Sequence, residues 1–86
     1  MTREQSQAAR GWMGWSQAEL AKRASVSVRT VQAFESGEKT PHANSIAAIR
    51  RAVEAAGIRL LFDRMGRAAG IVRQDADVDV PGTPAD

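Results

Sequence analysis

The sequence contains no cysteine, which excludes disulfides and thiolate metal sites. Its one histidine, His42, cannot form a zinc site without other ligands, and a loop position near a helix start is its ordinary interpretation. No apolar run approaches the length of a membrane span, and no secretion signal is evident. We therefore expect no metal ion, no other cofactor and no membrane insertion.

Residues that perform catalysis are also scarce. Without cysteine, and with a single histidine, the chain offers no nucleophile–base pair. No carboxylates are placed for acid–base work. We therefore expect that the protein is not an enzyme.

Charge is distributed unevenly along the 86 residues. All 12 lysines and arginines lie within residues 1–73, together with six of the 10 acidic residues. The other four acidic residues are Asp75, Asp77, Asp79 and Asp86. A basic body with an acidic tail favours a polyanionic partner for the body.

Residues 17–37 have the pattern of two short helices joined by a tight turn. Ser16 and Glu19 form an S-x-x-E capping box that predicts the first helix start. Ser27 is a suitable N-cap for the second helix, and Gly37 suits its end. Two such helices make a helix-turn-helix, whose second helix can enter the major groove of DNA.

Two further helices are predicted to flank this motif. Thr2 and Gln5 predict a capped helix that runs to about Met13, with Ala8, Ala9 and Trp12 in a thin apolar stripe. We expect both tryptophans, Trp12 and Trp15, to be core or near-core residues. Asn44 is the predicted N-cap of a fourth helix that carries Ile46, Ile49 and Val53 on one face, with Gly57 beyond its end.

The periodicity changes after Gly57. Residues 58–62 are short and apolar, which predicts a strand, although a fifth helix is an alternative. Residues 71–73 could return as a second strand. The proposed strand has Ile58, Leu60 and Phe62 on one face and an open backbone edge, so residues 58–73 are expected to contribute to a two-fold dimer.

The helix-turn-helix residues resemble a known family. They are similar to the phage repressor and Cro class of bacterial regulators, also called the xenobiotic-response-element class. The resemblance covers about residues 8–57 and implies a small repressor-like all-α domain of four helices at 1–57. A β-hairpin at 58–73 and a disordered acidic tail at 74–86 would follow. The matching positions are Arg10, Gly14, Trp15, Ser16, Gln17, Leu20, Ala21, Val26, Ser27, Val31, Glu35, Gly37, Pro41 and Ile46 to Ile49. One position differs, because Ser25 stands where the tight turn usually has glycine.

The resemblance also implies roles for particular residues. Gln17 matches the phosphate clamp of the family, and Arg10 and Glu35 match positions that form an ion pair. The outward side chains of the second motif helix are expected to contact bases, and these are Val28, Arg29, Gln32 and Ala33. Further candidates for phosphate contacts are Ser27, Thr30, Lys39 and Thr40.

These features favour a bacterial, cytoplasmic regulator that binds double-stranded DNA as a homodimer at a palindromic operator. A second hypothesis is the antitoxin of a toxin–antitoxin pair. An antitoxin would hold a toxin protein through the segment after Gly57 or through the tail, and could still bind DNA. Co-purification with a small basic partner would favour the second hypothesis, whereas a dimer that purifies alone would favour the first.

Overall fold

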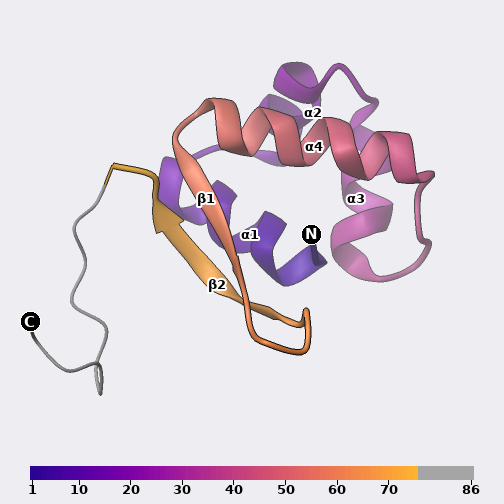
Figure 1. The fold of residues 1–86 in the computed structure, drawn as a ribbon. Coiled ribbons are helices and arrows are strands. Elements are labelled where there is room, and N and C mark those ends of the chain that lie inside the picture. Colours follow the sequence, from indigo (N-terminus) through magenta and orange to yellow (C-terminus); the bar gives the residue numbers. More distant parts are fainter. Residues whose placement is uncertain (76–86) are drawn as a thin grey trace, which may run out of the picture.

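The computed structural model describes residues 1–75, which form four helices followed by a two-stranded antiparallel hairpin (Figure 1). The hairpin lies across one end of the helices, with β1 against α4 and β2 against α1. None of the described helices is long and apolar enough to cross a membrane. The elements are α1 (Arg3–Met13), α2 (Gln17–Ala24), α3 (Val28–Ser36), α4 (Ala43–Ala55), β1 (Ile58–Phe62) and β2 (Ala68–Arg73).

The first three helices begin where short polar side chains cap free backbone amides. Thr2 and Gln5 form a full capping box at α1, with both reciprocal hydrogen bonds present. At α2 the Ser16 hydroxyl accepts from the Glu19 amide, but the Glu19 carboxylate accepts from Arg23 instead of capping Ser16. The capping box predicted for α2 is therefore only half formed, because the exposed i,i+4 ion pair takes the Glu19 side chain.

The fourth helix begins two residues earlier than predicted. Its N-cap is His42, which makes no side-chain capping hydrogen bond, and Asn44 lies exposed inside the first turn. The first turn is closed by the His42 carbonyl, which accepts from the amides of Ser45 and Ile46. The prediction of Asn44 as the cap was therefore wrong, and the start of α4 carries amides without a side-chain cap.

The core contains apolar residues from all four helices, together with two residues from β1. Leu20, Val31, Ile49 and Val53 are fully buried at its centre. The complete set is Ala9, Leu20, Ala21, Ala24, Val31, Phe34, Ile49, Val53, Ile58 and Leu60. The inward spacing of Val31 and Phe34 leaves the opposite face of α3 exposed.

Both tryptophans were expected at or near the core, but only Trp15 lies there. Trp12 is 65% exposed, so its assignment to the core was wrong. Trp15 is partly buried against the core, and the Arg23 guanidinium lies 4.3 Å from its ring centroid. On α1 the inward positions are taken by Gln5, Ser6 and Ala9, so the buried face of this helix is largely polar.

The hairpin is part of the same core. Ile58 is 2% exposed and Leu60 is 6% exposed, whereas Phe62 is 40% exposed. The pairing register shifts between Leu61 and Phe62, where Ala69 of β2 is the extra residue. Phe62 lies at the end of β1, with the Arg50 guanidinium of α4 5.5 Å from its ring centroid. Ile58 and Leu60 pack within their own chain, and the predicted contribution of residues 58–73 to a dimer stays a prediction.

The chain after β2 is described only for two residues of the predicted tail. Gln74 and Asp75 form a turn, in which the Gln74 amide donates to the Gly57 carbonyl at 2.6 Å and Asp75 pairs with Arg73. The predicted disorder of the rest of the tail, residues 76–86, lies outside the described residues.

A buried glutamine joins the hairpin to α1. The side-chain nitrogen of Gln5 donates to the carbonyls of Leu61 at 3.0 Å and Gly70 at 3.1 Å, one on each strand. Its side-chain oxygen accepts from the Thr2 amide at 3.0 Å. Gln5 is 3% exposed, so water does not replace these bonds readily.

Replacing Gln5 by alanine is therefore expected to lower the free energy of unfolding by about 1–3 kcal/mol, since two strand carbonyls lose their buried donor. Urea unfolding followed by circular dichroism measures this change. Gln32→Ala removes the same atoms from an exposed position of α3 and is the control. Equal destabilisation by the two substitutions would contradict the anchoring role.

Candidate nucleic-acid interface

Helices α2 and α3 are joined by the three-residue turn Ser25–Ser27. Ser25 has a left-handed backbone with φ of 57°, the conformation that glycine usually supplies at such a turn. The Val26 amide donates to the Ala21 carbonyl at 3.0 Å and closes the turn. A serine in this conformation costs about 1 kcal/mol, which the packing of α2 on α3 tolerates.

The N-terminal half of α3 presents an outward face of four side chains. Val28 is 40% exposed, Arg29 and Gln32 are exposed, and Ala33 is partly exposed. Among residues 1–75, no hydrogen bond or ion pair occupies the side chains of Arg29 and Gln32. The four predicted base-contacting residues therefore lie together on one accessible face.

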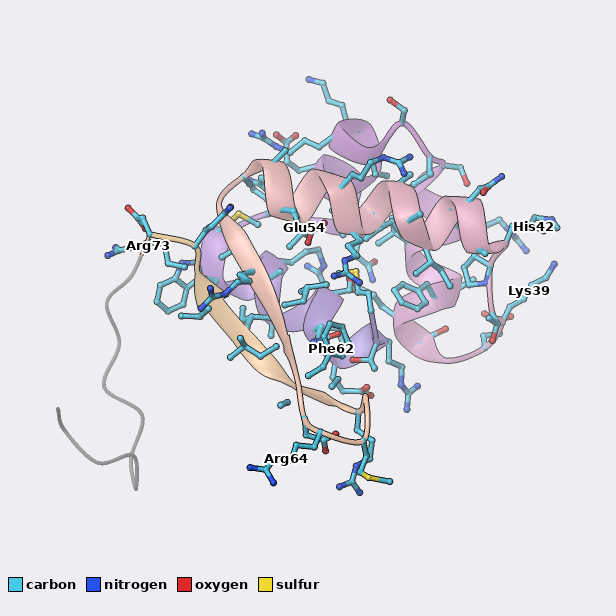
Figure 2. All side chains as sticks on the ribbon, viewed as in Figure 1. Lys39, His42, Glu54, Phe62, Arg64 and Arg73 are labelled. Carbon is cyan, nitrogen blue, oxygen red and sulfur yellow. The ribbon has the colours of Figure 1, made fainter. Side chains whose placement is uncertain are left out.

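A hollow of about 500 Å³ lies beside this face, between α3 and the start of α4. Lys39 and His42 lie together at this end of the molecule, remote from Arg73 (Figure 2). Two cationic side chains, Arg29 and Lys39, line the hollow, and no acidic residue does. The full lining is Ser27, Arg29, Thr30, Ala33, Lys39, Thr40, Pro41, His42 and Ser45.

The hydroxyl groups in this hollow are placed by the start of α3. The Ser27 oxygen accepts from the Thr30 amide at 3.1 Å, and the two hydroxyl groups lie 2.8 Å apart. Four of the five predicted phosphate-contacting residues, Ser27, Thr30, Lys39 and Thr40, line the hollow. The start of α4, which has no side-chain cap, adjoins the hollow. The cationic side chains, hydroxyl groups and free amides at this place suit an anion.

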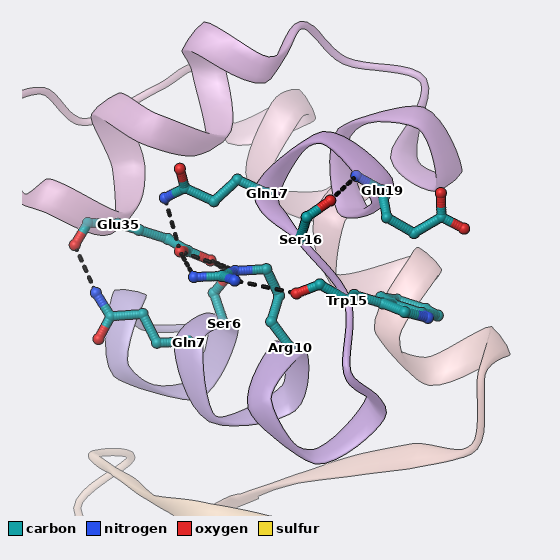
Figure 3. A network of polar contacts seen from close by, with 8 residues as sticks. All are labelled: Ser6, Gln7, Arg10, Trp15, Ser16, Gln17, Glu19 and Glu35. Carbon is teal, nitrogen blue, oxygen red and sulfur yellow. Dashed lines mark hydrogen bonds and ion pairs between the residues drawn. The ribbon is translucent and has the colours of Figure 1, made fainter.

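On the buried face of α3, the Glu35 carboxylate contacts side chains from α1 and α2 (Figure 3). Arg10 Nη2 lies 2.7 Å from Glu35 Oε1, and Arg10 Nε lies 3.0 Å from each carboxylate oxygen. The Ser6 hydroxyl donates to Glu35 Oε2 at 2.6 Å, and the Gln17 side-chain nitrogen donates to Oε1 at 3.1 Å. The structure thus brings Gln17, the fifth predicted phosphate-contacting residue, into contact with the Arg10–Glu35 pair.

Sequence reasoning did not find the polar residues of α1 that complete this network. Ser6 is fully buried, and the Gln7 side-chain nitrogen donates to the Glu35 backbone carbonyl at 2.8 Å. One signal was available, since Ser6 lies four residues before Arg10 and therefore shares its helical face. His42 and Ser45 were also missed as lining residues of the hollow.

The charge of Glu35 is stabilised by these donors. Burial alone would raise the pKa of Glu35, but hydrogen bonds from Arg10, Ser6 and Gln17 and the charge of Arg10 outweigh it. The pKa of Glu35 is therefore lowered from its ordinary value of 4.5. A carboxyl whose pKa is lower in the folded state stabilises the fold above its unfolded pKa, and this stabilisation is lost as the pH falls through the folded value.

We therefore expect the stability difference between the wild type and Glu35→Gln to shrink as the pH falls below about 4.5. Urea unfolding of both proteins from pH 7 to pH 3 measures the difference. Hydrogen bonds from Arg3 and from the Arg67 backbone also lower the pKa of Glu4 and of Asp63, respectively. Because both proteins contain these two carboxyl groups, the difference between the proteins isolates the contribution of Glu35. A difference that stays constant over this range would contradict the role assigned to the Glu35 charge.

Comparison with known proteins identifies the family of the chain. A family model for helix-turn-helix domains matches residues 7–58, more than half of the chain, and spans α2, the turn and α3. No curated protein sequence matches the chain. The matched segment also contains the outward face of α3 and the hollow beside it. The chain therefore belongs to the helix-turn-helix family of Cro- and repressor-type DNA-binding transcriptional regulators.

Proposed function

We propose that this protein is a bacterial transcriptional regulator that binds a palindromic operator as a homodimer and selects its sequence through α3. The observation that supports this most strongly is the outward face of α3, where Arg29 has no acidic partner among the described residues. A cationic side chain at the start of such a helix is available to a base edge in the major groove.

The four outward side chains suit different base edges. Arg29 suits guanine, whose O6 and N7 accept two hydrogen bonds from a guanidinium group. Gln32 suits adenine, and Val28 and Ala33 suit thymine methyl groups. Such contacts give the protein its sequence preference, because each base pair has a distinct donor and acceptor pattern in the major groove.

The phosphate contacts are assigned to the hollow and to the start of α2. Lys39 supplies charge, and Ser27, Thr30 and Thr40 supply hydroxyl groups on the same side of α3. Gln17 is the first residue of α2, where free amide donors and the helix dipole favour an anion. These contacts fix the position of α3 on the duplex without selecting a sequence.

Selection of bound fragments from random double-stranded DNA tests this function. The purified full chain is expected to enrich a palindromic sequence with half-sites about 10 base pairs apart, or a multiple of that spacing. Affinity should fall as salt concentration rises, since phosphate neutralisation releases counterions. Recovery of fragments with no common sequence would contradict sequence-specific binding.

The dimer is proposed to form through the outward face of the hairpin. Val72 pairs with the exposed Arg59, so both side chains lie on the face away from the core. Leu61 follows two residues after Arg59 and pairs with Gly70, which has no side chain to cover it. Leu61 and Val72 are only partly buried within their own chain, which leaves apolar surface for a second subunit.

Replacing both Leu61 and Val72 by glutamate is therefore expected to give a folded monomer with weaker operator binding. Sedimentation measures the mass, and circular dichroism measures the retained fold. Met65→Glu is the control, since Met65 is 78% exposed at the hairpin loop and lies outside this face. A double variant that remains a dimer would place the interface on another surface.

A further inference from the structure

The side-chain amide of Gln17 has one partner among residues 1–75. Its nitrogen donates to Glu35 Oε1 at 3.1 Å, and the rest of the amide group has no hydrogen bond there. The N-cap of α2 is Ser16, so the Gln17 side chain is not needed for capping. One N–H group and the carbonyl oxygen of this amide therefore remain available to a ligand.

An ionised carboxylate decides which way this amide points. It can only accept hydrogen bonds, so the nitrogen of Gln17, and not its oxygen, must face Glu35. Without that contact the amide could turn by half a rotation and exchange its oxygen and nitrogen. A phosphate also only accepts hydrogen bonds. In one of the two orientations the carbonyl oxygen of the Gln17 amide would therefore face the phosphate, and no hydrogen bond could form.

We propose that Glu35 is a positioning residue for DNA binding, which holds the Gln17 amide in the orientation that presents an N–H group to a backbone phosphate. The inference rests on the proposed function, because it assumes that Gln17 contacts DNA. Glu35 itself is 3% exposed, with its side chain on the buried face of α3, so it acts through Gln17 and not by touching the duplex.

Side chains of α1 fix the position of the Glu35 carboxylate on the side away from Gln17. Arg10 binds both carboxylate oxygens, and Ser6 binds Oε2 at 2.6 Å. Since these contacts hold Glu35 from α1, its Oε1 atom is a rigid acceptor for the α2 side chain. A functional side chain held by a rigid second residue loses less conformational freedom when it binds its ligand.

A double-mutant cycle in DNA affinity tests this role. The four proteins are the wild type, Gln17→Ala, Glu35→Leu and the double variant, each measured on the fragment selected by the wild type. Leucine offers no acceptor to the Gln17 nitrogen, whereas glutamine would keep one. We expect Gln17→Ala and Glu35→Leu each to weaken binding about fivefold. The double variant is expected to bind about as weakly as Gln17→Ala alone, because both substitutions remove one contact.

Gln7→Ala is the matched control. It removes a hydrogen bond from α1 to the Glu35 backbone carbonyl and leaves every contact of the carboxylate and of Gln17 in place, so DNA affinity is expected to stay at the wild-type value. Equal losses from Glu35→Leu in the presence and absence of Gln17 would overturn the positioning role and leave the proposed function intact. Wild-type affinity in Gln17→Ala would overturn both the phosphate contact and the positioning role.

Nuclear magnetic resonance of the free wild-type protein tests the orientation without DNA and without a variant that must fold. One side-chain amide proton of Gln17 is expected to exchange with water more slowly than those of Gln32, which is exposed on α3. If both Gln17 protons exchange as fast as those of Gln32, Glu35 does not hold the amide and the proposal is wrong.

Discussion

Replacing Arg10 by alanine is expected to lower the free energy of unfolding by about 3–5 kcal/mol, the cost of leaving a buried charge without its partner. The Glu35 side chain is 2% exposed and that of Arg10 is 22% exposed, so the carboxylate has little access to water. Part of its charge would still be stabilised by Ser6 and Gln17, which places the expected loss toward the lower end of this range.

Urea unfolding at pH 7 measures the loss, with Arg67→Ala as the control. Arg67 pairs with Asp63 at 2.8 Å, but its side chain is 76% exposed at the hairpin loop. A pair in water contributes about 0–1 kcal/mol, so this substitution should change stability little. If both arginine variants unfold at the same urea concentration, the Arg10–Glu35 pair does not join α1 to α3 energetically.

Replacing Arg29 by alanine is expected to cost about 1–3 kcal/mol in binding free energy on the preferred operator. Affinity for unrelated DNA should fall only slightly, because Arg29 is assigned to a base edge and the hollow retains Lys39. Fluorescence titration of the selected fragment and of a scrambled fragment measures both affinities.

Two further variants separate base contact from charge. Gln17→Ala should lower the affinity for both fragments by a similar factor, because a phosphate contact carries no sequence information. Arg51→Ala removes the same charge from an exposed position further along α4 and should leave the preference between the fragments unchanged. If Arg51→Ala lowers the preference as much as Arg29→Ala does, general charge and not base contact explains the effect.

Sequence reasoning predicted the helices well because their starts depend on local chemistry. Thr2, Ser16 and Ser27 each accept from a backbone amide in the first turn of their helix. The inward residues of α3 also follow from spacing alone, since Val31 and Phe34 lie three residues apart. The hairpin was predicted from a change in periodicity and is present, with β2 beginning at Ala68, before the expected start at Ile71.

Apart from the N-cap of α4, the errors concern residues whose environment is set by distant parts of the chain. Trp12 lies on the predicted apolar stripe of α1, yet the hairpin and α3 meet that helix on the face of Gln5 and Ser6. The bulge after Leu61 comes from the pairing of β1 with β2, and local sequence does not specify it. The hydrogen bond from Gln17 to Glu35 likewise joins residues 18 positions apart.

The central claim is that α3 selects the operator sequence through Arg29, and a base-by-base binding profile of the wild type and Arg29→Ala tests it most directly. Every position of the selected operator is changed in turn, and the affinity of each protein is measured. We predict that the variant loses discrimination at one base pair in each half-site and keeps it at the others. A profile of unchanged shape would contradict the claim, because Arg29 would then contribute no sequence information.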